Sequence, residues 1–209
     1  MAGLLHVIDF NLNYAISALS RYPHSRVAKI SLLFNRSVSL DAGALVLKLH
    51  TTGVMWNGEA CPSGIGAVPS WSVSTTGGRV DLIGFSGANV ITGQDNFNTL
   101  ADGVYAVEVV GSKVHDAANA NITADNETKV FYVLFGDTND SVDTSNGDGS
   151  THHVATVNSG DKAIFDAAFN NPPNYDAGLD YNGSGSINSG DSLEFHANLN
   201  HPMEWDTYD

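Results

Sequence analysis

The sequence predicts a mainly β fold, an antiparallel β-sandwich followed by a small α-helical unit. Three observations carry this prediction. Short runs in which apolar and polar residues alternate, separated by turn-forming residues, recur up to residue 135. No helical spacing of apolar residues occurs before residue 159. From residue 137 onward the charge changes: thirteen acidic residues stand against Lys162 alone, whereas residues 1–136 hold ten acidic and eight basic residues.

Seven segments have the pattern of short strands. Along the first, apolar side chains alternate with polar or small ones, which indicates a half-buried strand. The second, third and sixth repeat this alternation, the pair Gly77-Gly78 separates the fourth from the fifth, and the seventh is a continuous apolar run. Seven strands with turns between them favour an antiparallel sandwich. In order, the segments are residues 8–16, 28–34, 45–49, 71–73, 80–82, 105–109 and 129–135.

Residues 180–191 have the spacing of a calcium-binding loop. Oxygen-bearing side chains fall at loop positions 1, 3, 5, 9 and 12, and the glycine at position 6 allows the sharp turn that presents the main-chain carbonyl of position 7. This is the order of an EF-hand loop, with serine at position 5 and aspartate at position 12 as departures. The candidate ligands are Asp180, Asn182, Ser184, Ser186 through its carbonyl, Asn188 and Asp191.

The end of this loop occurs a second time, thirty residues earlier. Residues 157–161 match residues 187–191, so the chain contains two copies of one loop–helix unit. The first copy carries an insertion of 13 residues within residues 140–156. Its candidate ligands are Asp137, Asn139, Asp148, Asn158 and Asp161, of which Asp148 belongs to the insertion. The two helices are expected to pair through Phe165, Phe169, Phe195 and Leu199.

Residues 136–200 resemble a dockerin-type tandem of calcium loops, each followed by one helix. The run Phe135-Gly136-Asp137 resembles the usual start of such a tandem, and dockerin-type loops have aspartate at position 12. The resemblance implies calcium as the cofactor and a cohesin-like protein receptor as the partner, contacted by Ser159 and Ser189. The family tends to have threonine after these serines, where this chain has glycine, so calcium binding carries over better than cohesin binding does.

Residues 25–135 resemble the Ig-like domains of large bacterial secreted and surface proteins. The resemblance rests on residues 34–40, 100–105 and 114–119, where Asp102-Gly103 opens a strand and residues 116–119 close a turn by side-chain to main-chain hydrogen bonds. In that family such domains are spacers or adhesive modules, commonly followed by dockerin-like loops. Two domains are therefore expected: residues 1–135, the Ig-like sandwich, and residues 136–209, the dockerin-like unit.

Composition restricts the partners and the location. A net charge of −14 repels phosphate backbones and anionic lipids, so neither nucleic acid nor a membrane surface is an expected partner. No stretch approaches the ~20 apolar residues of a membrane span, and residues 1–5 lack the pattern of a signal peptide. The single cysteine, Cys61, excludes an intramolecular disulfide. Calcium loops of low charge suit a calcium-rich exterior, so the expected location is secreted or cell-surface.

The sequence does not predict an enzyme. Ser86 lacks the strand–turn–helix elbow of a serine nucleophile, and His115-Asp116 falls within the Ig-like turn. Two weaker alternatives stay open: a transition-metal role for His152-His153 and a pair of catalytic carboxylates drawn from the three glutamates of the first domain. These glutamates are Glu59, Glu108 and Glu127.

The expected function is that of a non-enzymatic extracellular calcium-binding module for protein–protein interaction or cell-surface attachment. Two further interpretations remain. In the first, the chain is a carbohydrate-binding or hydrolase-accessory module, and Trp56 and Trp71, which flank a long connection, form its sugar-stacking platform. The chain can also be a purely structural link of a large surface protein, with calcium stiffening the junction.

Overall fold

In the computed structural model, residues 5–13, 25–50, 55–56, 59–60, 69–94, 98–139, 142–143 and 152–206 are described. These residues form a mainly β fold with several antiparallel sheets and two short α-helices, α1 (Ser159–Ala168) and α2 (Ser189–Asn198), which confirms the predicted class. The strands are β1 (Val7–Asn13), β2 (Lys29–Phe34), β3 (Val38–Leu40), β4 (Leu45–His50), β5 (Met55–Trp56), β6 (Glu59–Ala60), β7 (Ser70–Thr76), β8 (Arg79–Ser86), β9 (Val90–Thr92), β10 (Asn98–Leu100), β11 (Gly103–Val109), β12 (Val114–Asp116), β13 (Asn119–Thr123), β14 (Glu127–Val133), β15 (Val142–Asp143), β16 (His152–Thr156) and β17 (Pro202–Asp206).

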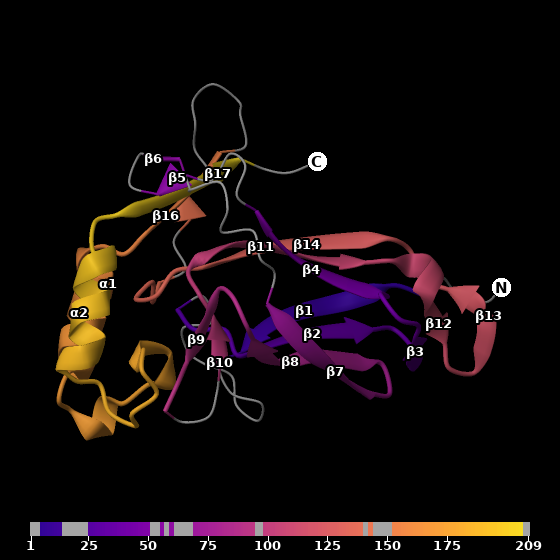
Figure 1. The fold of residues 1–209 in the computed structure, drawn as a ribbon, viewed down its shortest axis with the longest axis horizontal. Coiled ribbons are helices and arrows are strands. Elements are labelled where there is room, and N and C mark those ends of the chain that lie inside the picture. Colours follow the sequence, from indigo (N-terminus) through magenta and orange to yellow (C-terminus); the bar gives the residue numbers. More distant parts are fainter. Residues whose placement is uncertain are drawn as a thin grey trace.

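Two sheets enclose the larger hydrophobic core. One has the strand order β1-β2-β8-β7 and the other β14-β11-β4, and they lie as layers in the centre of the molecule (Figure 1). Ile30 faces Leu82 across the first sheet and Val107 faces Leu47 across the second, and all four side chains are buried in one cluster. Because alternate strand residues point to the same side, the period of two in the sequence produces this core. All seven segments predicted as strands contain or overlap a strand of the structure.

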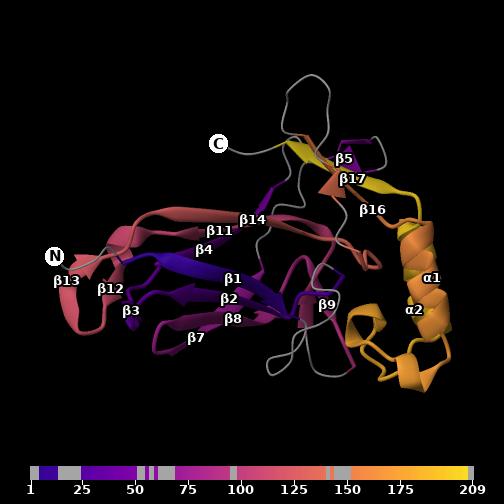
Figure 2. The same ribbon diagram turned by 180° about the vertical axis from the view of Figure 1, so that it is seen from behind.

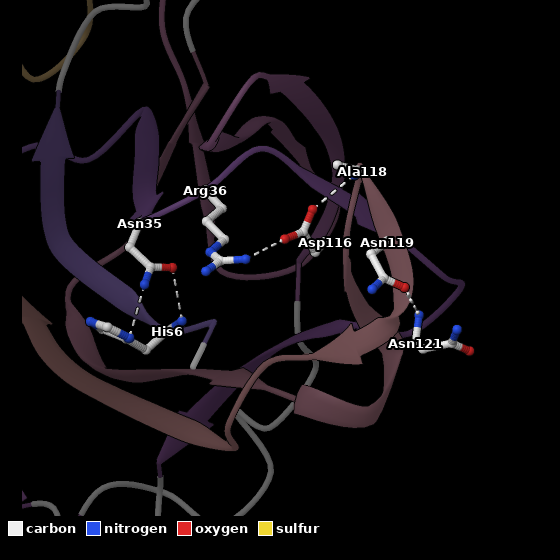
Figure 3. Close-up of polar contacts among 7 residues, drawn as sticks. All are labelled: His6, Asn35, Arg36, Asp116, Ala118, Asn119 and Asn121. Carbon is white, nitrogen blue, oxygen red and sulfur yellow. Dashed lines mark hydrogen bonds and ion pairs between the residues drawn. The ribbon is translucent and has the colours of Figure 1, made fainter. Parts of the chain in front are cut away.

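A small sheet with the order β13-β12-β3 lies at the end of the molecule opposite the helices (Figures 1 and 2). Its turn is closed by Asp116, whose carboxylate accepts hydrogen bonds from the main-chain N–H of Ala118 at 2.8 Å and from Arg36 at 2.9 Å (Figure 3). Asn119 then accepts from the N–H of Asn121 at 3.2 Å. The predicted closure of this turn by side-chain to main-chain hydrogen bonds is confirmed, and Asp116 serves structure there.

A five-stranded sheet joins segments from both sides of residue 135. Its order is β15-β16-β17-β5-β6, so β5 pairs with β17, and β6 joins the sheet through β5. Met203 in β17 lies opposite Ala155 in β16 on one side and opposite Trp56 in β5 on the other. The insertion in the first loop supplies β15 and β16. The boundary expected at residue 135 therefore separates the sequence patterns but is crossed by main-chain pairing.

The two helices lie side by side at one end of the molecule (Figures 1 and 2). The rings of Phe165 and Phe195 stack between them with centroids 4.2 Å apart, and both side chains are buried. They belong to a second hydrophobic core that also includes Val104 of β11 and Tyr132 of β14, so this core connects the helices to the central strands. Neither described helix is long and apolar enough to cross a membrane.

Candidate metal centre

The second loop ends in a capping box that starts α2. Asn188 is the N-cap residue, and its side-chain oxygen accepts a hydrogen bond from the main-chain N–H of Gly190 at 2.9 Å. Asp191, three residues later, accepts from the N–H of Asn188 at 2.8 Å. The pattern Asn-Ser-Gly-Asp therefore satisfies helix donors that would otherwise lack partners. It also fixes loop positions 9 and 12 at the first turn of α2.

The middle of the loop turns around its first aspartate. Gly183 and Gly185 have φ angles of +64° and +85°, the left-handed region that glycine adopts without a steric cost. This conformation directs the main-chain N–H groups of Ser184 and Gly185 at the Asp180 carboxylate, at 3.0 and 2.7 Å. Tyr175 adds a hydroxyl donor at 3.0 Å. The glycine predicted at position 6 thus makes the sharp turn that the pattern requires.

Oxygen atoms of loop positions 1, 3 and 7 lie within hydrogen-bond distance of Ser184, which is position 5. Its N–H lies 3.0 Å from Oδ1 of Asn182, and its Oγ lies 3.0 Å from the main-chain carbonyl oxygen of Ser186 and 3.5 Å from Oδ1 of Asp180. Carboxylate, amide, hydroxyl and main-chain carbonyl oxygens are the donors that calcium takes in proteins. The residues present in this loop therefore fit a calcium ion.

Positions 9 and 12 reach the same place from the start of α2. The amide nitrogen of Asn188 lies 3.0 Å from Oγ of Ser184 and 3.1 Å from the carbonyl oxygen of Ser186, because its oxygen caps the helix. Asp191 accepts from the N–H of Asn182 at 3.2 Å, which ties position 12 to position 3. Position 9 of such loops often acts through a water molecule, whereas here the side-chain oxygen of Asn188 caps α2 and its nitrogen donates toward the loop.

The loop buries two negative charges. The side chains of Asp180 and Asp191 are both 0% exposed. Burial, with the nearby charge of Asp180 as a further cause, raises the pKa of Asp191 above its ordinary value. A buried charge is costly unless a partner compensates it. Two buried carboxylates beside neutral oxygens therefore form an arrangement that a divalent cation would stabilise.

The first loop brings its two ends together in a similar way. Asp137 and Asp161 are both 0% exposed. Tyr132 donates its hydroxyl to Asp137 at 2.6 Å, as Tyr175 does to Asp180 in the second loop. Asp161 differs from Asp191, since it accepts from both the N–H and the hydroxyl of Thr138, at 2.8 and 2.7 Å. Three donors, counting the N–H of Asn158, thus occupy its carboxylate.

The middle of the first loop lies outside the described part of the chain. Asp148, the ligand predicted from the insertion, belongs to it. Asn139 is described and exposed, next to the buried Asp137. Asn158 is the N-cap of α1, with the same capping box that Asn188 forms at α2. The structure therefore places four of the five predicted residues of this loop at its two ends, and the capping box of Asn158 and Asp161 repeats that of the second loop.

Sequence reasoning missed the tyrosines and the helix-ending asparagines of this site. Tyr132 and Tyr175 each precede the first aspartate of a loop by five residues, and this shared offset is a signal that the sequence carries. Asn170 and Asn200 follow the helices with φ angles of +51° and +62°. Their N–H groups donate to the carbonyl oxygens at position 8 of the other loop, Ile187 at 2.9 Å and Val157 at 2.8 Å. The two repeats thus hold each other through equivalent main-chain bonds.

His152 and His153 do not share a site. His152 contacts the carboxylate of Glu204 at 3.3 Å, whereas His153 stacks on the ring of Trp205. Neighbouring residues of a strand point to opposite faces, so the two imidazoles of β16 face different surroundings. In the described segments, no three histidine, cysteine or acidic side chains are grouped closely enough to hold one ion. The second loop itself offers two carboxylates, with neutral oxygens as its other donors.

The alternative sites of the first domain are also separated. Glu108 lies opposite Thr128 and Glu127 lies opposite Val109, so the two glutamates point to opposite faces of their sheet. The side chain of Glu59 lies outside the described part. Trp56 stands in β5 and Trp71 in β7, strands of different sheets, and the side chain of Trp56 is not described.

No protein-family model matches the chain, and neither the curated proteins nor the solved structures give a match. The functional conclusion therefore rests on the geometry of the loops.

Proposed function

We propose that the chain is a non-enzymatic, extracellular calcium-binding module in which an Ig-like sandwich is joined to a dockerin-like pair of calcium loops. The observation that carries this proposal is the clustering of oxygen atoms of Asp180, Asn182 and the Ser186 carbonyl around Ser184. The thirty-residue repeat of loop and helix supports it, since each copy starts a helix with the same capping box. A secreted or cell-surface location follows from the same proposal, because weak calcium loops fill where calcium is abundant.

Few ligand charges set the expected affinity. The second loop contributes Asp180 and Asp191, and its other donors are neutral. Calcium affinity depends on the number of ligand charges, so we expect a dissociation constant of about 10⁻⁴ to 10⁻³ M, the class of extracellular modules. Bound calcium supplies the positive charge that joins the start of the loop to the start of α2. The chain itself makes the sharp turn at Gly183 and Gly185 and fixes position 12 through the capping box.

Calorimetric titration of the purified chain with calcium tests the proposal. We expect millimolar or submillimolar binding that Asp180→Asn abolishes or weakens at least about tenfold, because it removes one of two ligand charges. Asp166→Asn is the matched control, since Asp166 lies on the exposed face of α1 beside Lys162 and outside both loops. Equal binding by both variants, or no heat from any of them, would contradict the proposal, as would sub-micromolar affinity.

A cohesin-like receptor is the proposed partner. Ser159 and Ser189 are the first residues of α1 and α2, and both are exposed. Because the two helix starts are equivalent positions of the repeat, a receptor would meet an exposed serine hydroxyl at the start of each helix.

Binding of purified cohesin domains, compared with and without chelator, is expected to depend on calcium and to be lost in Ser159→Asp/Ser189→Asp. Ser74→Asp, on the exposed strand β7, should leave binding unchanged. If calcium binds and no receptor does, the chain serves as a structural link in a larger surface protein.

A second candidate function is carbohydrate binding at Trp71. A groove of about 470 Å³ lies between β7 and the β3–β4 segment, and Trp71, Asp41 and Thr75 are among its lining residues. An aromatic face beside hydroxyl and carboxylate groups is the chemistry of a sugar subsite. Polysaccharide is expected to shift the tryptophan fluorescence of the chain, and Trp71→Ala to abolish that shift. An unchanged shift in Trp71→Ala removes this groove from consideration.

A further inference from the structure

Two neighbouring residues of the sandwich hold the turn that leads into the second calcium loop. Arg26 is 1% exposed, and its guanidinium donates hydrogen bonds to the main-chain carbonyl oxygens of Asp180 and, at 3.4 Å, of Ala177. The hydroxyl of Ser25, also 1% exposed, donates to the carbonyl oxygen of Gly178 at 2.6 Å. Arg26 and Ser25 precede β2 and lie roughly 150 positions from the loop in the sequence. They therefore fix the main chain at Asp180, the first predicted ligand, and just before it.

Arg26 also brings a positive charge to the loop. Burial lowers the pKa of its guanidinium to about 10, while the negative charges of Asp180 and Asp191 act in the opposite direction. Arginine remains charged under these conditions. The hydrogen bonds that these carboxylates accept from Tyr175 and from main-chain N–H groups bring no full positive charge, whereas Arg26 lies against the main chain of Asp180 and its charge interacts with both carboxylates.

We propose that Arg26 is a positioning residue that acts as the built-in counter-cation of the second loop, stabilising the loop without calcium and weakening its affinity for calcium. This inference rests on the proposed calcium function of that loop. Two like charges that are buried together are stabilised by a nearby opposite charge. The same charge repels an arriving cation. Calcium and the guanidinium thus compensate the same pair of carboxylates, and the arginine sets the calcium concentration at which the loop fills.

The first test compares wild type with Arg26→Met, which keeps much of the side-chain volume and removes the charge, and with Arg26→Lys, which keeps the charge. In chelator, Arg26→Met is expected to melt below both other proteins. Calcium should raise its melting temperature by more than it raises that of wild type, and its calcium dissociation constant should be lower by about tenfold. Arg26→Lys should stay close to the wild-type calcium affinity. A calcium response of Arg26→Met equal to or smaller than that of wild type overturns the proposal and leaves Arg26 as a structural tie.

A second measurement is made in chelator alone, so it does not depend on calcium binding. If Arg26 compensates the buried carboxylates, Arg26→Met should cost less stability in an Asp191→Asn background than in wild type, because one carboxylate is already neutral. Additive costs would contradict the counter-cation role even where calcium binds as proposed. Coupling without any calcium response would instead retain the counter-cation and reject the calcium function. Should Arg26→Met fold only with calcium present, that dependence itself supports the proposal.

Discussion

At the scale of single residues, the stacked pair of phenylalanines carries the contact between the repeats. Phe165 is 1% exposed and lies 4.2 Å, centroid to centroid, from Phe195. Phe165→Ala should lower the free energy of unfolding by about 3–5 kcal/mol, through lost burial and the cavity left behind. Leu193→Ala is the control, because Leu193 is 76% exposed and its loss should change stability by less than about 0.5 kcal/mol. Urea denaturation in saturating calcium measures both. Similar values for the two variants would show that this helix face is not core.

Asp102 makes stability depend on pH. Its carboxylate accepts from the N–H of Phe135 at 2.9 Å and from Asn198 at 2.7 Å. Burial raises its pKa from 3.8 to about 7, and the charge of Glu194 adds to the rise. The folded protein therefore binds this proton more tightly than the unfolded chain does. The stability that Asp102 contributes is present below its unfolded pKa, falls as pH rises from about 4 to about 7, and stays low above that range.

The variant Asp102→Asn isolates this effect, because it cannot ionise. Wild type should lose stability relative to Asp102→Asn between about pH 4 and about pH 7, at up to roughly 1.4 kcal/mol per pH unit within the window. Comparing the two proteins at each pH cancels the titration of all other groups, including the loop carboxylates. Urea denaturation of the two proteins at several pH values across this window measures the difference in their free energies of unfolding. A constant difference would mean that folding does not raise the pKa of Asp102.

At the scale of elements, the sequence signals that succeeded were those with enough residues to show a period. The alternation along β11 and the repeat that starts α1 and α2 are visible over five or more residues, and the structure has these elements. Strands such as β9 and β12 hold three residues each, too few for a period, and form because a partner strand is present. β17 was also missed, although Met203 and Trp205 alternate with Glu204, since its partners lie about 50 and 150 residues away.

β17 provides a prediction at this scale. Met203 is 0% exposed at the centre of the five-stranded sheet, while Glu204, the next residue, points to the other face and contacts His152. Met203→Ala should cost about 2–5 kcal/mol, and Glu204→Ala, on the partly exposed face, about 1 kcal/mol or less. Thermal melts followed by circular dichroism compare the two. Equal costs would mean that β17 does not anchor the helical unit.

At the scale of the whole molecule, residues of one predicted unit complete the other. The sequence patterns change near residue 135 in composition and in period, and this predicted two independent units. The contacts that join them, such as Asp102 with Asn198 and Ser25 with Gly178, connect positions 96 and 153 residues apart. Each is a single polar residue without any periodic neighbour. Local patterns carry no information about such contacts, which is why Arg26 and Ser25 were not predicted as part of the candidate site.

This joining predicts that calcium stabilises the chain as one body. The second hydrophobic core includes Val104 and Tyr132 of the central sheet, and the N–H of Gln94 donates to the carbonyl oxygen of Asn182 in the second loop at 2.8 Å. Opening the helical pair therefore exposes apolar surface of β11 and β14, so the two parts should unfold together.

Hydrogen exchange measured by mass spectrometry, in chelator and in millimolar calcium, tests this. Calcium should slow exchange in β2 as well as in α2, through global unfolding. Asp180→Asn should remove both effects. If calcium slows exchange in α2 alone, the helical pair opens by itself, and the contacts of Asp102, Ser25 and Gln94 are too weak to couple the two parts.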